Sequence, residues 1–424
     1  MAHSPSSPFP RVALVRQTLY RNPLEDIAAN VTKSLARLPL SEHFQPKQRV
    51  AVAVGSRGID RLAEVVTACI AHLKDLGLQP FVVPAMGSHG GATAEGQQAV
   101  LSKLGITPQR IGAPVEPEMD VECLDRLSNG TRLYFSTKAL EADHIVLINR
   151  VKLHTKFRAP VESGLCKMLT IGLGKAEGAA EFHRRAVGHG FGIIETAAAR
   201  LIERCPVRFG LALLEDGCGN LTQIKAVLPE AFIEMEKTLL KQASAMMARI
   251  PFDNLDVLVI DRIGKDISGI GMDSNVTGRH RDLVGDFHAT PHPRRIFVRD
   301  LSPASDGNAN GIGLADATTR RLVDALNREK TYRNAITAIS LEKAAIPAYF
   351  DTDREALEVC ARSAGLESLQ QARLVRILDT KHLEVLQVSE SLQLDIDSEP
   401  NLQQLTPWEP LAFDAHDNLP PFNE

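Results

Sequence analysis

The sequence has no excess of charge of either sign and no long hydrophobic run. Its 48 basic and 52 acidic residues give a formal charge of -4, whereas proteins that bind nucleic acid or anionic membranes carry clustered positive charge. No stretch approaches the roughly eighteen apolar residues of a transmembrane helix. A basic start followed by an apolar core, as in a secretory signal, is missing from the first residues, MAHSPSSPFPRVALV. We therefore expect a cytoplasmic protein that binds neither nucleic acid nor membrane.

Paired cysteines are also missing. The six cysteines are scattered, and no two form the CxxC pattern of a structural zinc site. Disulfide frameworks are typical of small secreted domains, a class that this chain does not fit. We expect reduced thiols, most of them buried, at Cys69, Cys123, Cys166, Cys205, Cys218 and Cys360.

The chain is long enough for more than one hydrophobic core. It has 424 residues, of which 44% are hydrophobic, and single cores stop growing beyond about 250–300 residues. The sequence predicts a first domain at residues 1–250 and a second at 251–424, whose last residues could return to the first domain. We expect two α/β domains with mainly parallel sheets and an active site in the crevice between them. The partner would be a small molecule or another copy of the chain.

In the first domain, short apolar runs typical of strands buried on both faces alternate with amphipathic segments. A helix is expected at residues 62–76, and Thr93 is the candidate N-cap of another helix that ends near Gly105. The three strand segments are RVAVAVGS from Arg49, QPFVVPAMGS from Gln79 and DHIVLINRV from Asp143.

The second domain is expected to open after a helical stretch at residues 231–250. A strand in IPFDNLDVLVID is followed by two glycine-rich loops, RIGKDISGIGMD and SDGNANGIGL. A helical stretch, ADATTRRLVDALN, and a last strand, LEVLQVSESL, come after them. The proline-rich tail after Glu399 would wrap a surface or stay loose.

Two of the first-domain strands end in related glycine turns. VAVGSRGI and VPAMGSHGG both place Gly-Ser-x-Gly after a buried strand, with Arg57 and His89 at the same position of the turn. Ligands of open parallel sheets bind outside the carboxyl ends of the strands. We therefore expect Arg57 and His89 to point into one crevice.

Two further histidines and a lysine are candidates for chemistry. His154 follows the third strand and so reaches the same rim, although it could also be a solvated residue of a basic loop that binds an anionic ligand. His183 lies in the expected helix AEGAAEFHRRA, where a surface position is the alternative. Lys167 lies among apolar residues, and lysine is rarely buried unless it is paired or modified. Desolvation would favour its neutral, reactive amine.

In this order the motifs resemble those of the nickel-dependent lactate racemase family. That family has a strand-end arginine, a histidine in a glycine loop, a second histidine, a lysine in a glycine-rich segment and a helical histidine. Here these are Arg57 in GSRG, His89 in GSHG, His154 in LHTKF, Lys167 in GLCK and His183 in EFH. The distance from Lys167 to His183 (183 − 167 = 16) matches the family and is the most specific part of the resemblance.

The resemblance implies a nickel pincer nucleotide, joined to Lys167 through a thioamide, with His183 as the protein ligand to nickel. The lysine then loses its charge, so its burial is no longer costly. His89 and His154 would be the acid/base pair. Each enantiomer of a 2-hydroxy acid needs its own base while hydride leaves for the pyridinium ring and returns to the opposite face.

Further contacts to cofactor and substrate follow from the same resemblance. Ser56 and Ser88, from the two Gly-Ser turns, would contact the cofactor. Arg57 would bind the substrate carboxylate, helped from the second domain by Lys265 in the segment RIGKDISGIGMDSNVTGR. The other candidates in that segment are Asp266, Asn275 and Arg279.

This sequence also departs from the family pattern. The stretch between His154 and Lys167 is longer, Cys166 stands where the family often has a basic residue, and Val54 stands where it has an acidic one. An altered cofactor pocket or substrate is therefore expected.

The main hypothesis is a racemase or epimerase of a 2-hydroxy acid, which meets the cofactor-synthesis enzymes transiently and lacks the cofactor when made without them. One alternative is an enzyme that uses Lys167 as a Schiff-base lysine for pyridoxal phosphate. Another is a carrier that binds a nucleotide without turnover.

Overall fold

The computed structural model describes residues 9–40, 44–56, 58–283 and 289–422. The chain divides into two compact units: the first unit is Tyr20–Met247, and the second unit combines Met1–Leu19 with Ala248–Glu424. The expected first domain, 1–250, differs from this division at its start. β1 (Arg11–Gln17) pairs with strands close to the C-terminus, so the chain's beginning joins the second unit.

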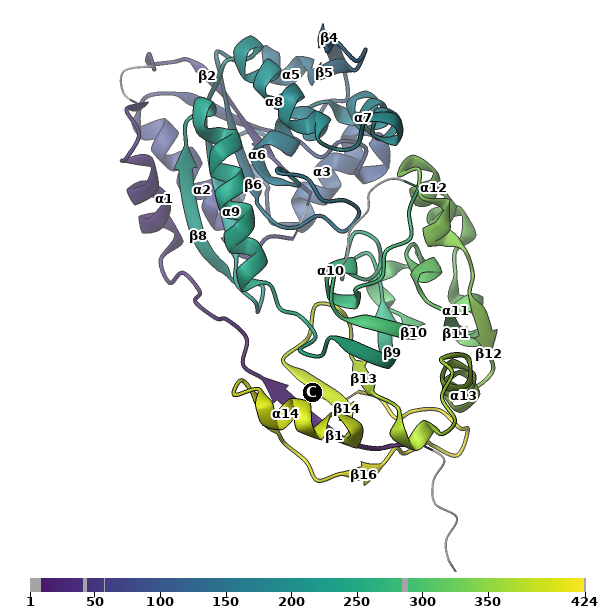
Figure 1. The fold of residues 1–424 in the computed structure, drawn as a ribbon. Coiled ribbons are helices and arrows are strands. Elements are labelled where there is room, and N and C mark those ends of the chain that lie inside the picture. The colour runs from purple at the N-terminus through teal and green to yellow at the C-terminus, as the bar shows by residue number, and fades with distance from the viewer. Residues whose placement is uncertain (1–8, 41–43, 57, 284–288, 423–424) are drawn as a thin grey trace, which may run out of the picture. The chain divides into compact units, whose positions relative to one another are not determined.

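The first unit is built on a five-stranded sheet with the order β3-β2-β6-β7-β8 (Figure 1). The first four strands in that order are parallel, and β8 is antiparallel to β7. A separate hairpin is formed by β4 and β5. The strands are β2 (Arg49–Val54), β3 (Gln79–Pro84), β4 (Val121–Arg126), β5 (Arg132–Ser136), β6 (His144–Arg150), β7 (Val207–Glu215) and β8 (Leu221–Val227).

Helices cover both faces of this sheet. On one face, apolar side chains of α1 and α2 share a core with Val50, Val52 and Val54 of β2. On the other face β7 carries Gly210, where a Cβ would lie 3.1 Å from Phe232 of α9. The helices are α1 (Ile27–Leu35), α2 (Leu62–Asp75), α3 (Ala94–Lys103), α4 (Pro108–Ile111), α5 (Thr137–Leu140), α6 (Gly164–Lys167), α7 (Lys175–His189), α8 (Ile193–Arg204) and α9 (Phe232–Met246).

The second unit is built on a nine-stranded sheet. Its main path is β12-β11-β10-β9-β13-β14-β1-β15, and β16 pairs with β1. The pairs from β12 to β13 are parallel, and the remaining pairs are antiparallel. The strands besides β1 are β9 (Asn254–Ile263), β10 (His292–Leu301), β11 (Ala317–Thr319), β12 (Ala348–Phe350), β13 (Leu374–Ile377), β14 (Val385–Ser389), β15 (Leu402–Gln404) and β16 (Glu409–Pro410).

Five α-helices accompany this sheet among the described residues: α10 (Ser274–Thr277), α11 (Arg320–Ala325), α12 (Arg328–Thr337), α13 (Asp353–Ser363) and α14 (Gln393–Ser398). The two sheets confirm the predicted α/β class with mainly parallel strands. The predicted crevice between two domains stays a prediction.

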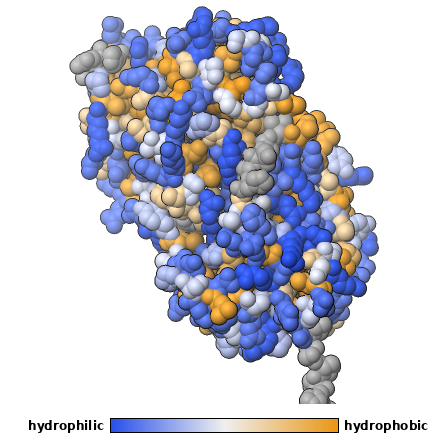
Figure 2. Space-filling model, viewed as in Figure 1, coloured by the Kyte–Doolittle hydropathy of each residue, from blue (hydrophilic) through white to orange (hydrophobic). Residues whose placement is uncertain are grey.

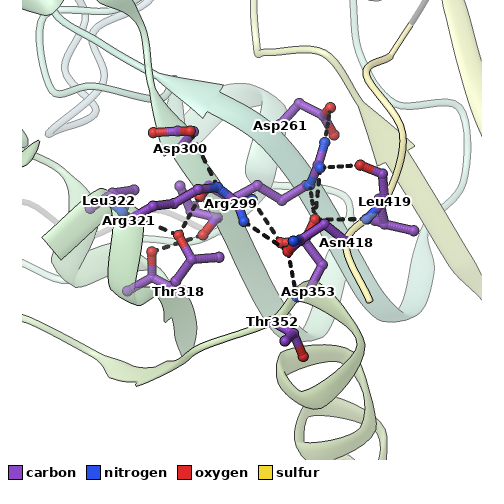
Figure 3. A network of polar contacts seen from close by, with 12 residues as sticks. Asp261, Arg299, Asp300, Thr318, Arg321, Leu322, Thr352, Asp353, Asn418 and Leu419 are labelled. Atoms are coloured by element: carbon purple, nitrogen blue, oxygen red, sulfur yellow. Dashed lines mark hydrogen bonds and ion pairs between the residues drawn. The ribbon is translucent and has the colours of Figure 1, made fainter. Parts of the chain in front are cut away.

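A buried network of charges fastens the C-terminal tail to this sheet (Figure 3). Arg299 on β10 donates from Nε to Asp353 at 2.8 Å, is paired with Asp261 on β9, and donates to the Leu419 carbonyl at 2.6 Å. Arg376 on β13 donates to Asp261 and to the Pro420 carbonyl. The tail therefore completes the hydrogen bonding of two buried cations.

Several elements match the sequence predictions, and others correct them. The strands from Arg49, Gln79 and Asp143 are present as β2, β3 and β6, and Thr93 caps α3 by accepting from Gly96 N. The expected helical stretch ADATTRRLVDALN instead starts as β11, and only its second half is α11. β10 was missed because Arg299 and Asp300 interrupt its apolar run, and Arg299 is neutralised only by residues distant in sequence.

The surface in the view of Figure 2 is mostly hydrophilic, with apolar residues scattered among the polar ones. Among the residues that the structure describes, no helix has both the length and the apolar character needed to cross a membrane.

Candidate functional site

Two of the predicted site residues meet beyond the carboxyl ends of β2 and β3. These strands are parallel neighbours, with Val54 opposite Pro84, so the turns after them lie side by side. Ser56 Oγ is hydrogen-bonded to Nδ1 of His89, and this bond restrains the orientation of the imidazole ring. Ser88 is half-buried next to His89. Arg57 lies outside the described residues.

His154 lies in a loop after β6 that is organised by a buried carboxylate. Glu162 is 3% exposed and accepts hydrogen bonds from the backbone N–H groups of His154, at 2.7 Å, and Ala159, at 3.2 Å. Its oxygen also lies 3.5 Å from a guanidinium nitrogen of Arg158. Burial raises the pKa of Glu162 despite these partners. Hydrogen bonds between the loop's own residues therefore stabilise its conformation.

The ring of His154 has a defined hydrogen bond of its own. The N–H of Lys156 donates to His154 Nδ1 at 3.1 Å. An imidazole nitrogen that accepts a hydrogen bond carries no proton, so the neutral ring has its proton on Nε2.

Two stacked phenyl rings bring together His154, Lys167 and His183. The ring centroids of Phe157 and Phe191 lie 3.9 Å apart, and the angle between the ring planes is 7°. Both side chains are buried. The His154 ring stacks on Phe157 at 4.2 Å, and the His183 ring meets Phe191 edge-on at 6.1 Å. We call this arrangement the Phe157–Phe191 cluster.

Lys167 lies against the same rings. Its Nζ is 5.7 Å from the centroid of Phe157, within the range of a cation–π interaction. The side chain is only half-buried, which corrects the expectation of a lysine enclosed by apolar residues. The fully buried lysine of this segment is Lys175.

The backbone around Lys167 has an unusual form. Lys167 is the last residue of α6, and a π-helical turn, Met168–Gly172, follows directly; such turns are frequent at functional sites. Asn149 at the end of β6 donates to the Gly164 carbonyl at 2.7 Å. This bond ties the start of α6 to the sheet.

A buried glutamate binds the first N–H groups of α6. Glu236 on α9 is 1% exposed and accepts from the backbone of Leu165 and, at 3.2 Å, of Cys166. Burial raises the pKa of Glu236 to about 7 and also raises the pKa of the Cys166 thiol. Gly164 has φ +87° and lies directly against this carboxylate. Glycine is therefore needed at this position.

His183 projects from α7, in agreement with the expected helix. Among the described residues no three histidine, cysteine, aspartate or glutamate side chains form a group that could hold a metal ion. An imidazole suits nickel, but nickel at His183 would need most of its donors from another source.

Lys265 lies in the second unit, in the loop after β9. Its Nζ contacts Asn334 Oδ1 on α12. Nearby, Ser302 Oγ donates to Asp266 at 2.5 Å. The part of Lys265 in substrate binding stays a prediction.

Sequence reasoning missed the residues that hold the candidates in place. Phe157, Phe191, Glu162 and Glu236 follow no motif, because each acts through a partner that folding brings to it. One sequence signal could have indicated Glu236, because a carboxylate on an apolar helix face must find a buried partner. Glu236 lies among Phe232, Leu239 and Ala243, which are the other buried residues of α9.

Comparisons with known proteins found one matching domain family and a similar solved structure. Residues 12–190 match the lactate racemase N-terminal domain. A solved structure, the lactate racemase apoprotein from Thermoanaerobacterium thermosaccharolyticum, is similar with a TM-score of 0.51 at 12% identity. The match covers 87% of this chain and 94% of that chain, and it shows a shared fold. No curated protein sequence matches.

Proposed function

We propose that this protein, whose residues 12–190 match the lactate racemase N-terminal domain, racemises or epimerises a 2-hydroxy acid. This match over residues 12–190 agrees with the resemblance that the motifs indicated. The observation that carries the proposal is the Phe157–Phe191 cluster, around which His154, Lys167 and His183 lie together.

We infer that Lys167 carries a nickel pincer nucleotide and that His183 binds its metal. When bound, this group supplies a ring that accepts a hydride from the substrate carbon and returns it. The stacked phenyl rings give the site an apolar wall, which excludes water from one side. Acylation would remove the charge of Lys167, and the stem of this half-buried side chain could stay against Phe157.

The proton transfers would fall to His89 and His154. Each would hold or release the proton of the substrate hydroxyl for one enantiomer. Ser56 restrains the ring of His89, and Glu162 restrains the loop of His154. For His154 to accept a proton at Nε2, the ring proton must move to Nδ1, so the hydrogen bond from Lys156 N–H has to open.

The test is to produce the protein together with the cofactor-synthesis enzymes. Its intact mass and its nickel content are then measured. A third measurement follows the exchange of the carbon-bound hydrogen of 2-hydroxy acids by the protein. We expect an adduct that Lys167→Ala removes, while Lys241→Ala, at an exposed lysine of the same unit, keeps it. His183→Ala should lose the metal. His89→Ala and His154→Ala should keep the adduct and abolish exchange.

Other results would point to the alternatives. A protein that loses activity on borohydride treatment and binds no nickel would be a pyridoxal phosphate enzyme that uses Lys167. An adduct without hydrogen exchange across a panel of 2-hydroxy acids and sugar acids would indicate a carrier. Full activity of His89→Ala or His154→Ala would remove that histidine from the mechanism.

A further inference from the structure

A lysine that the proposed chemistry does not use is fully buried just after the π-helical turn. Lys175 is 0% exposed and begins α7 with φ +53°. A left-handed backbone is unfavourable for a residue with a side chain, and burying an amine is unfavourable unless the amine is hydrogen-bonded. Strain of this kind persists only where the surroundings enforce it.

The amine of Lys175 is directed at the end of β3. Its Nζ donates to the carbonyl of Pro84, the last residue of that strand, at 2.5 Å, and to Gln97 Oε1 at 3.3 Å. Burial lowers the pKa of Lys175 to about 8, and the charge of Glu118 opposes this shift. Charged or neutral, the amine keeps protons to donate to these two oxygens.

Gln97 extends the contact to the turn that carries His89. It lies on α3 and is 0% exposed. Its Nε2 donates to the carbonyl of Gly87 at 2.8 Å and, more weakly, to that of His89 at 3.4 Å. Lys175 and Gln97 together therefore bind three carbonyls between the end of β3 and His89.

The same turn is fastened to the segment that carries Lys167. Gly87 N–H donates to the carbonyl of Gly172, the last residue of the π-helical turn, at 3.1 Å. Lys167 precedes this turn and Lys175 follows it. One continuous segment thus carries Lys167 at its start, and its later residues Gly172 and Lys175 are hydrogen-bonded to the stretch from Pro84 to His89.

We propose that Lys175 and Gln97 are positioning residues that fix His89 relative to Lys167. This inference rests on the proposed function, in which His89 moves a proton while Lys167 carries the cofactor. A residue that only fills space would not explain the pattern, because an apolar side chain would fill the same volume without a buried amine and would not donate to Pro84 and Gln97.

The first test uses the protein without cofactor, so it does not depend on activity. Hydrogen–deuterium exchange is measured by mass spectrometry for peptides that cover residues 85–92. The variants are Lys175→Met, which keeps the unbranched stem of the side chain but removes the amine and its donors, and Gln97→Glu. The carboxylate of the second variant can still accept from Lys175 but cannot donate to Gly87 or His89. The matched control is Lys241→Met, at an exposed lysine on α9.

We expect exchange at residues 85–92 to be faster by on the order of tenfold in both variants and unchanged in the control. Exchange in α2, which does not contact this turn through any of the hydrogen bonds described, should stay the same. Unchanged protection of residues 85–92 in both variants would overturn the proposal. If Lys175→Met does not fold, Gln97→Glu decides the question.

The second test uses protein loaded by the cofactor-synthesis enzymes. Both variants should keep the adduct on Lys167, while kcat for hydrogen exchange falls on the order of tenfold to a hundredfold with little change in KM. Turnover equal to that of the wild type would refute the positioning role. If the wild type is inert but residues 85–92 respond as expected, the proposed function fails and the anchoring of the His89 turn stands.

Discussion

Buried ionisable side chains give the candidate site much of its local order. Glu162 accepts hydrogen bonds from the His154 loop, Glu236 accepts them from the start of α6, and Lys175 donates one to the end of β3. Each is nearly inaccessible to water, and each is hydrogen-bonded to backbone groups that a loop or helix end would otherwise leave without partners. The free energy lost by burying these groups is offset by the backbone groups that they satisfy.

The titration of Glu236 gives a prediction for stability against pH. Because burial raises its pKa from 4.5 to about 7, the folded state binds a proton that the unfolded state releases between these values. Stability should therefore fall as the pH rises through this window, and the cost, on the order of 3 kcal/mol, should be complete above about pH 7. Glu236→Gln lacks this titration.

The measurement is the free energy of unfolding of the wild type and of Glu236→Gln between pH 5 and pH 8. The variant should gain stability relative to the wild type as the pH rises. Glu230→Gln, at an exposed glutamate, is the control and should follow the wild type. Parallel curves for the wild type and Glu236→Gln would show that the carboxyl is ionised throughout.

At the scale of elements, the segment of α6, the π-helical turn and α7 links the parts of the site. α6 carries Lys167, and α7 carries His183 and starts with the buried Lys175. Changes to the backbone of this segment should therefore affect several site residues at once. Gly164 is the most sensitive position, because it combines a positive φ with close contact to Glu236.

Gly164→Ala should displace the start of α6. The left-handed backbone alone costs an alanine about 1–2 kcal/mol, and the new methyl group would also collide with the Glu236 carboxylate. Gly219→Ala is the matched control, since Gly219 has φ +82°, close to that of Gly164, but open space around its Cβ position. Thermal unfolding should show a clearly larger loss for Gly164→Ala, which should also lose the adduct on Lys167. Equal losses would mean that α6 can move away from α9 freely.

At the scale of the whole molecule, both ends of the chain belong to the second unit. β1 lies between β14 and β15, and the tail residues Leu419 and Pro420 accept hydrogen bonds from Arg299 and Arg376. The first unit is an uninterrupted stretch, Tyr20–Met247. In the sequence, the first unit is therefore an insertion between the two segments of the second unit.

Arg299→Met should destabilise the second unit strongly. The substitution leaves the carboxylates of Asp261 and Asp353 buried without one of their cations (Figure 3), and breaking such a buried pair costs about 3–5 kcal/mol. Arg320→Met removes an exposed ion pair with Asp351 and should cost less than about 1 kcal/mol. Denaturant unfolding of both variants measures the difference, and a cost for Arg299→Met as small as for Arg320→Met would contradict this account of the network.

Local patterns in the sequence determined the α/β class, the strands β2, β3 and β6 with the helices between them, and the set of motifs that carries the resemblance to lactate racemases. These features depend on residues close together in the chain: periodicity defines an element, and the helix that carries His183 follows from its own segment. The same patterns pointed to Lys167 as the buried lysine, whereas in the structure Lys175 is fully buried and Lys167 is half-buried.

Only the tertiary structure decided what surrounds these residues. The stacking of Phe157 on Phe191, the contact of Glu236 with α6 and the grip of Lys175 and Gln97 on the His89 turn all join distant segments. The same holds for β1, which lies in the second unit, and for β10, whose Arg299 is neutralised by Asp261 and Asp353. Burial and charge pairing are properties of neighbours in space, and a sequence states only the neighbours along the chain.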